Sequence, residues 1–155
     1  MDKIFTKNIE HESAIKHVTG NAIYTDDIAE PRNLLHAVIG YSNCSKGVIK
    51  SINYDEVYKS KGVIDIITEK DIEGINDVGA IFKGDKIFTS KNIDYFGQPI
   101  FAVIATSNIL AKKAALKVKI NIKESKPILT IKDALRKKSF VLEPRDFSRG
   151  DVNKG

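Results

Sequence analysis

Residues 100–105 read Ile-Phe-Ala-Val-Ile-Ala, and this apolar run constrains the fold more than any other segment of the chain. Its length and its β-branched content predict a strand at the centre of a sheet, buried on both faces. Ser107 is expected to be the N-cap of a helix that ends near Leu116. Apolar residues 110, 111, 114 and 118 lie along one stripe of that segment, which can pack on the sheet. From Lys117 to Lys123 polar and apolar residues alternate, which predicts a half-buried strand.

Four more strands are predicted ahead of this central unit. They are residues 18–24, 34–41, 47–53 and 63–67. The strand at 34–41 is expected to be a buried run. In the strand at 47–53, alternation is expected to place Val48, Lys50 and Ile52 on one face. Ile49 and Ser51 are then expected on the other face.

Short helical turns are expected between the strands. One or two turns are predicted at residues 55–59, and residues 74–86 are predicted to be a loop. Two capping boxes, Thr68 with Asp71 and Thr130 with Asp133, each predict the start of a short helix. This irregular order of elements predicts an α+β fold with a mixed sheet and two to three short helices, and not a regular βαβ repeat.

The length of 155 residues suits one domain, and a hydrophobic fraction of 42% allows an ordinary core. We expect an N-terminal arm at residues 1–16, the domain at 17–138 and a polar connector at 139–155. Cys44 is the only cysteine, so no disulfide forms within the chain, which favours a reducing, cytoplasmic setting. Neither a signal peptide nor a membrane span is expected.

Positive charge is concentrated near the C-terminal end. Residues 110–138 hold ten Lys or Arg against Glu124 and Asp133, a local net charge of +8 in a chain of +5. This stretch has no aromatic residue to stack on a nucleic-acid base. Lys117, Lys119 and Lys123 are expected on one face of the predicted strand, as on a solvated sheet. A charged outer face of an ordinary sheet is therefore the better interpretation, and nucleic acid is not an expected partner. A basic binding module for nucleic acid or an acidic protein is kept as the alternative function.

The motifs that resemble catalytic signatures are incomplete. Gly79 to Lys86 has the glycine spacing of a phosphate-binding loop, but Asp85 stands where the motif needs lysine. Residues 40–44 lack the last glycine of a nucleophile elbow. Asp26 and Asp27 are interpreted as turn formers, because adjacent side chains of an extended segment point apart.

The residues that could ligate a metal are also isolated in the sequence. His11, His17 and His36 show no spacing typical of metal ligands, and Cys44 is interpreted as a structural thiol. One cysteine cannot hold an iron–sulfur cluster, which takes four thiolates. No catalytic, cofactor-binding or metal-binding residue is assigned to this chain.

Six segments nevertheless resemble, in order, the α/β-hammerhead domain of the xanthine dehydrogenase and aldehyde oxidase family. They are His17-Val18-Thr19-Gly20 with Ala22, Tyr24, Asp26 and Asp27; Ser51-Ile52-Asn53 with Lys61-Gly62-Val63; Thr68, Asp71, Ile72, Gly74 and Asn76; Tyr95-Phe96-Gly97-Gln98-Pro99-Ile100 with Val103 and Ala105; Ala114-Ala115 with Val118; and Arg149-Gly150-Asp151-Val152. Lys61 replaces the family's usual proline. Residues 42–47 depart from the pattern Ser-x-x-Ala-His-Ala that relatives often show.

The resemblance implies an N-terminal domain of a molybdenum hydroxylase. Such enzymes oxidise aromatic heterocycles or aldehydes at molybdopterin, and electrons leave through iron–sulfur clusters to FAD or another acceptor. The cofactor segments and the catalytic glutamate of the family lie downstream of the hammerhead domain. We therefore expect a structural domain, as a fragment or a separate subunit, that binds no cofactor and is not catalytic alone. Its expected partners are the molybdopterin-binding domain and the iron–sulfur and flavin subunits.

Overall fold

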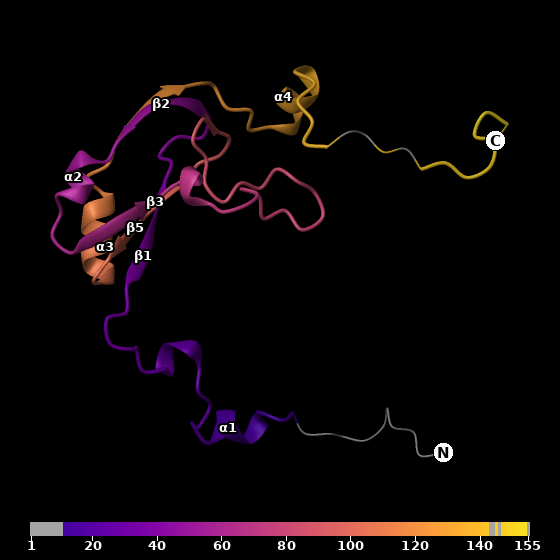
Figure 1. The fold of residues 1–155 in the computed structure, drawn as a ribbon. Helices are drawn as coiled ribbons and strands as arrows, with labels where there is room; N and C mark the ends of the chain where they lie inside the picture. Colours follow the sequence, from indigo (N-terminus) through magenta and orange to yellow (C-terminus); the bar gives the residue numbers. More distant parts are fainter. Residues whose placement is uncertain (1–10, 143–144, 146, 155) are drawn as a thin grey trace, which may run out of the picture. The chain divides into compact units, whose positions relative to one another are not determined.

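The computed structural model describes residues 11–142, 145 and 147–154. The chain divides into two compact units, and the boundary in the sequence lies between Leu34 and Leu35. Figure 1 traces the elements along the sequence. The first unit contains a short helix, α1 (Ala14–Val18), and a 3-10 turn, η2 (Thr25–Asp27). The second unit contains all the strands of the described chain. The N-terminal arm predicted at 1–16 lies partly outside the described residues, and its last residues belong to α1.

The prediction of a strand at residues 18–24 is wrong. After α1 the backbone folds back on the helix, because the N–H groups of Asn21 and Ala22 both donate to the carbonyl of Lys16, at 2.8 and 3.0 Å. Gly20, with a φ of +73°, permits this reversal. The turn at Thr25-Asp26-Asp27 is confirmed, since the Asp27 carboxylate accepts a hydrogen bond from the N–H of Tyr24 at 2.9 Å.

The second unit is α+β, as predicted, but its strands form two antiparallel sheets and not one mixed sheet. The strands are β1 (His36–Tyr41), β2 (Gly47–Asn53), β3 (Val63–Ile67), β4 (Asn92–Ile93), β5 (Pro99–Ala105) and β6 (Lys119–Glu124). The first sheet has the order β1-β5-β3 and the second has the order β4-β2-β6. The short strand β4 was not predicted, because two residues are too few to show a pattern. The central position of β5 is confirmed, with Val103 fully buried.

Two details of strand burial differ from the expectation. β1 is half-buried and not a buried run, because it is an outer strand of its sheet. In β2 the register against β6 shifts between Ile49 and Ser51, a β-bulge that breaks strict alternation. As a result Ile49 is buried and Ile52 also packs against the core, although the sequence placed them on opposite faces.

The helices of the second unit are α2 (Asp55–Tyr58), α3 (Asn108–Ala115) and α4 (Ile131–Arg136), with a 3-10 turn η3 (Glu69–Asp71). The predicted N-cap of α3 is confirmed, because the Ser107 hydroxyl accepts from the N–H of Leu110 at 3.3 Å. α3 lies against β1 and β5 (Figure 1), and its Ala111 and Ala114 are fully buried. Within the described chain no helix has the length and apolarity needed to cross a membrane.

Both predicted capping boxes form caps. The Asp71 carboxylate accepts from the N–H of Thr68 at 2.7 Å, and the Thr130 hydroxyl accepts from the N–H of Asp133 at 3.1 Å. The predicted strand before α4 is confirmed as β6, with Ile120 and Ile122 packed against the core. Lys119 and Lys123 of β6 are exposed, as expected, whereas the exposed Lys117 lies before the strand.

Candidate functional site: a groove bordered by β1, α3 and β6

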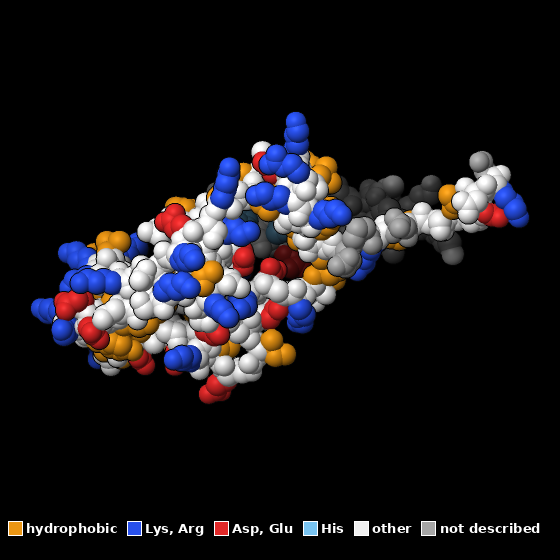
Figure 2. Space-filling model, turned by 90° about the horizontal axis from the view of Figure 1, so that it is seen from above, with side chains coloured by type: hydrophobic (Ala, Val, Ile, Leu, Met, Phe, Trp, Pro, Cys, Tyr) orange, Lys and Arg blue, Asp and Glu red, His pale blue; other side chains and the backbone are white. Residues whose placement is uncertain are grey.

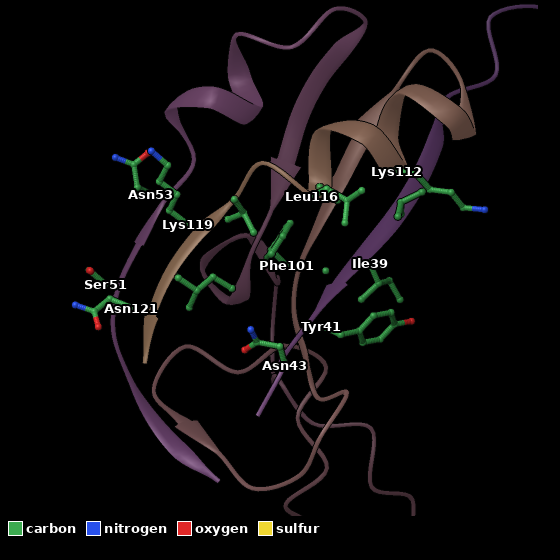
Figure 3. A pocket seen from close by; sticks show the side chains of 15 residues that line it. Ile39, Tyr41, Asn43, Ser51, Asn53, Phe101, Lys112, Leu116, Lys119 and Asn121 are labelled. Atoms are coloured by element: carbon green, nitrogen blue, oxygen red, sulfur yellow. The ribbon is translucent and has the colours of Figure 1, made fainter. Parts of the chain in front are cut away.

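An open groove of about 910 Å³ lies within the second unit. It is bordered by β1, the C-terminal end of α3 and β6, and the ring of Phe101 from β5 lies at its centre (Figure 3). Figure 3 shows Leu116 and Lys112 on the helix side and Ile39 and Tyr41 on the β1 side. The groove combines residues that are distant in the sequence.

Gly40 makes room for the floor of this groove. The ring of Phe101 occupies the space that a Cβ at position 40 would need, closer than van der Waals contact allows. Phe101 also packs edge-on against Tyr54, with ring centroids 5.3 Å apart. Burial, with smaller contributions from Tyr58 and Asp71, raises the pKa of Tyr54 to about 12. The Phe101 ring is 1% exposed, so it is a closely packed base beneath the groove.

The lining has a distinct chemical character. Val38, Leu116, Val118 and Ile120 give it apolar side chains, and Leu116 is 86% exposed although it is a large hydrophobic residue. Its charged residues are Lys112 and Lys119, and no Asp or Glu lines it. Asparagine and serine complete the lining at positions 43, 51, 53 and 121. Such a set can bind a partly apolar, uncharged or acidic group, but it offers no nucleophile beside a base.

The incomplete nucleophile elbow is structural. The Ser42 hydroxyl is buried, donates to the Tyr95 carbonyl at 3.0 Å and accepts from the N–H of Gln98 at 3.2 Å. The Gln98 side chain in turn accepts from the N–H of Asp94 at 2.8 Å. These bonds fix the turn before β5. Cys44 beside it is a free cysteine, 7% exposed in the core.

The loop with phosphate-loop spacing uses its own carboxylate. Asp77 accepts hydrogen bonds from the N–H of Gly84 at 2.6 Å and of Gly79 at 2.7 Å. These bonds, that of Gly84 first, lower the pKa of Asp77 below its usual value. The two glycine N–H groups are thus engaged with a carboxylate of the same loop, which agrees with the rejection of a phosphate site.

Each of the three histidines has its own surroundings. In the first unit the Tyr24 hydroxyl and His17 Nδ1 lie 3.0 Å apart, beside a hollow of about 290 Å³. His11 accepts from the N–H of Ser13 at 3.2 Å, and His36 starts β1 opposite Ala105. Among the residues that the structure describes, no three His, Cys, Asp or Glu side chains are grouped so that they could hold a metal ion.

The lysines and arginines of the basic stretch belong to several elements, α3, β6 and α4 among them. Figure 2 shows lysine and arginine side chains scattered among acidic and apolar ones on the face seen from above. Lys117 donates to the Ser60 hydroxyl at 2.9 Å, and Arg136 pairs with Asp133 within α4. The charge excess of the sequence is therefore spread over several elements.

Sequence reasoning missed the groove itself. Gly40 and Phe101 were seen only as parts of strands, and Leu116 only as the end of a helix. The one available signal is that Leu116 lies outside the apolar stripe of α3, so a large apolar side chain is left over. Its neighbours in the groove come from β1 and β6, and only the tertiary fold shows that.

Comparison with known proteins gives a consistent result. Residues 19–126 match the family model described as "Aldehyde oxidase and xanthine dehydrogenase, a/b hammerhead domain". The chain is 36% identical over 97% of its length to a xanthine dehydrogenase of Dictyostelium discoideum. It is 35% identical over 94% of its length to a xanthine dehydrogenase/oxidase of Gallus gallus. It spans only 11% of the length of each of these two relatives.

A solved structure supports the same assignment. The aldehyde oxidoreductase from Desulfovibrio desulfuricans superposes with a TM-score of 0.77 and 28% identity, over 88% of this chain and 16% of that one. The family match over residues 19–126 includes β1 to β6. The chain belongs to the family of aldehyde oxidase and xanthine dehydrogenase α/β-hammerhead domains.

Proposed function

We propose that this chain serves as the structural hammerhead domain of a cytoplasmic, xanthine-dehydrogenase-like molybdenum hydroxylase that oxidises aromatic heterocycles or aldehydes. The observation that carries the proposal is the 36% identity to a xanthine dehydrogenase over 97% of the chain. In this proposal the domain spans residues 17–138. Residues 1–16 form an arm and residues 139–155 a connector toward a molybdopterin-binding domain.

The chain's own residues do not fit a molybdenum or iron–sulfur site. Its single cysteine is buried in the core, whereas an iron–sulfur cluster takes four thiolates. The described residues also group no three metal-ligating side chains. We therefore place molybdopterin, the iron–sulfur clusters and FAD or another acceptor on partner domains or subunits, and we derive no chemical step on this chain.

The proposed role is to pack against the molybdopterin-binding domain. Large apolar side chains remain exposed on several elements of the second unit, including Ile64 of β3, Ile109 of α3 and Leu116. Exposed apolar surface of this kind is typical of contact surfaces. A partner domain that covers these side chains would remove apolar surface from water, and this burial would stabilise the complex of the two.

The test is reconstitution of the enzyme from parts. The chain is expressed alone and together with the molybdopterin-binding polypeptide of the same enzyme, and both samples are analysed by size exclusion and metal analysis. We expect a stable complex that contains molybdenum and turns over a purine or an aldehyde, and no turnover by the chain alone. Turnover by the chain without its partner would overturn the structural role, and failure to form a complex would overturn the assembly.

The basic binding module is the competing function. The net charge of +8 over residues 110–138 motivates it. It requires binding to duplex or single-stranded DNA that weakens steeply as salt rises, because cationic side chains release counterions from phosphates. A fluorescence titration at two salt concentrations separates the two functions. No DNA binding at low salt would remove the alternative.

A further inference from the structure

The groove is bordered by consecutive residues of two strands, and also by Ser51 and Asn53 of β2 beside β6. Four consecutive residues of β1, 38–41, line it, and so do residues 118–121, which include the start of β6. Successive side chains of a strand point to opposite faces of its sheet. Residues of both faces can border one cavity where the strand presents its edge to that cavity. Figure 3 shows β1 and β6 on the two sides of Phe101.

The topology agrees with this geometry. β1 is an outer strand of the sheet β1-β5-β3, and β6 is an outer strand of the sheet β4-β2-β6. In the described part of the chain, β1 pairs with β5 alone and β6 with β2 alone. Each strand therefore has one side whose backbone N–H and C=O groups are free of strand pairing. Such an edge can accept a further strand from another polypeptide.

We propose that this groove binds an extended, acidic and apolar segment of the partner polypeptide by strand addition to β1 or β6. The inference rests on the proposed function only for the source of the segment, which is the molybdopterin-binding domain. Backbone hydrogen bonds supply affinity, and side chains of the segment contact the lining of the groove.

The lining determines the chemistry of the segment. The exposed side chains of Ile39 and Leu116 and the half-buried Val38 can provide apolar contacts to an extended peptide, and the 1% exposed Phe101 ring lies beneath them. Lys112 and Lys119 are the charged residues of the lining, and no carboxylate accompanies them. Charge complementarity therefore selects Asp or Glu at the remaining positions. A second copy of this chain is a poor occupant, because its net charge of +5 would oppose the same lysines.

The direct test uses defined peptides and the complete chain. The probe is an acetylated and amidated heptapeptide of alternating Asp and Val, and its control replaces every Asp by Lys. Backbone pairing is tested with two further versions of the probe that are N-methylated on alternate amides. Amide shifts of the 15N-labelled chain report affinity and location. We expect the acidic probe to bind with shifts confined to β1, β6 and the end of α3. The lysine peptide should bind at least tenfold more weakly, and at least one methylated version should lose binding.

Variants of the chain locate the site. Lys112→Glu and Lys119→Glu should each weaken the acidic probe at least fivefold, and Leu116→Asn should do the same through the apolar contact. Lys123→Glu is the matched control, since Lys123 is an exposed lysine on the same strand outside the lining, and it should leave affinity unchanged. All four side chains are exposed, so the variants are expected to fold.

The remaining outcomes overturn the proposal. One is that the acidic probe does not bind at concentrations below 1 mM, and another is that the groove variants bind it with the same affinity as the parent. The others are that both methylated probes still bind, or that the chain associates with itself through β1. Failure of the groove is distinguishable from failure of the proposed function. A Leu116→Asn/Lys119→Glu variant that still forms the full complex with the molybdopterin-binding polypeptide refutes the groove alone. A parent chain that binds the peptide but forms no complex refutes the proposed function alone.

Discussion

Gly40 and Phe101 share a space that only one side chain can occupy. A Cβ at position 40 would overlap the Phe101 ring, which is itself 1% exposed and held by its neighbours. We expect Gly40→Ala to lower the free energy of unfolding by about 2 kcal/mol, because overpacking a core forces side chains off their preferred rotamers. Urea unfolding measures the change. Ile39→Ala, at a 41% exposed position of the same strand, is the control and should cost less.

Tyr54 should make stability depend on alkaline pH. Burial raises its pKa from 10.0 in the unfolded chain to about 12 in the fold, so the fold favours the neutral phenol. The contribution is fully present below pH 10 and is lost as the pH rises through about 12. Absorbance at 295 nm should show a phenolate step near pH 12 that is missing in Tyr54→Phe. If the extra phenolate of the parent appears near pH 10 instead, burial does not raise the pKa of Tyr54.

At the scale of elements, the cap of α3 gives a clear prediction. The Ser107 hydroxyl satisfies the N–H of Leu110, so Ser107→Ala should cost about 1 kcal/mol of stability. Ser107→Asp is the matched variant, because a carboxylate accepts the same bond and favours the helix N-terminus. Thermal unfolding should rank the parent and the aspartate variant above alanine. Equal stability of all three would show that the cap contributes nothing.

The strand β5 carries the second prediction at this scale. Val103→Asp places an unpaired charge at a fully buried position, which costs several kcal/mol and should abolish folding. Ile64→Asp, at a 56% exposed position of β3 in the same sheet, is the control and should fold. Circular dichroism and amide dispersion compare the two variants. A Val103→Asp variant that melts like the parent would mean that β5 is not central.

The elements that were predicted correctly are those whose signal is local. The apolar run of β5, the Ser107 cap and the alternation of β6 each depend on the identity of a few neighbouring residues. The signals that failed depend on partners elsewhere in the chain. Residues 18–24 have strand-like composition but no neighbouring strand, so the backbone bonds back to Lys16. The bulge in β2 arises from its register with β6, which no window of sequence contains. For the same reason the groove could not be predicted.

At the scale of the whole molecule, the buried apolar core belongs to only one of the two units. Every residue of the buried apolar core among the described residues comes from position 44 or beyond. The first unit contributes none, and α1 has no buried residue. The sequence resemblance begins at His17, ahead of this division, so the family pattern extends further than the core.

Removal of residues 1–34 tests this division. Because the core lies in the second unit, the chain from Leu35 onward should fold alone, with a melting temperature within a few degrees of the parent. Truncation after Val118 is the control, because it removes Ile120 and Ile122 of β6 from the core, and it should unfold the protein. Thermal unfolding followed by circular dichroism compares the three chains. Complex formation with the molybdopterin-binding polypeptide is then measured for the chain that starts at Leu35. If that chain melts like the parent but binds less tightly, the first unit acts in assembly; if it does not fold, the core extends beyond the second unit.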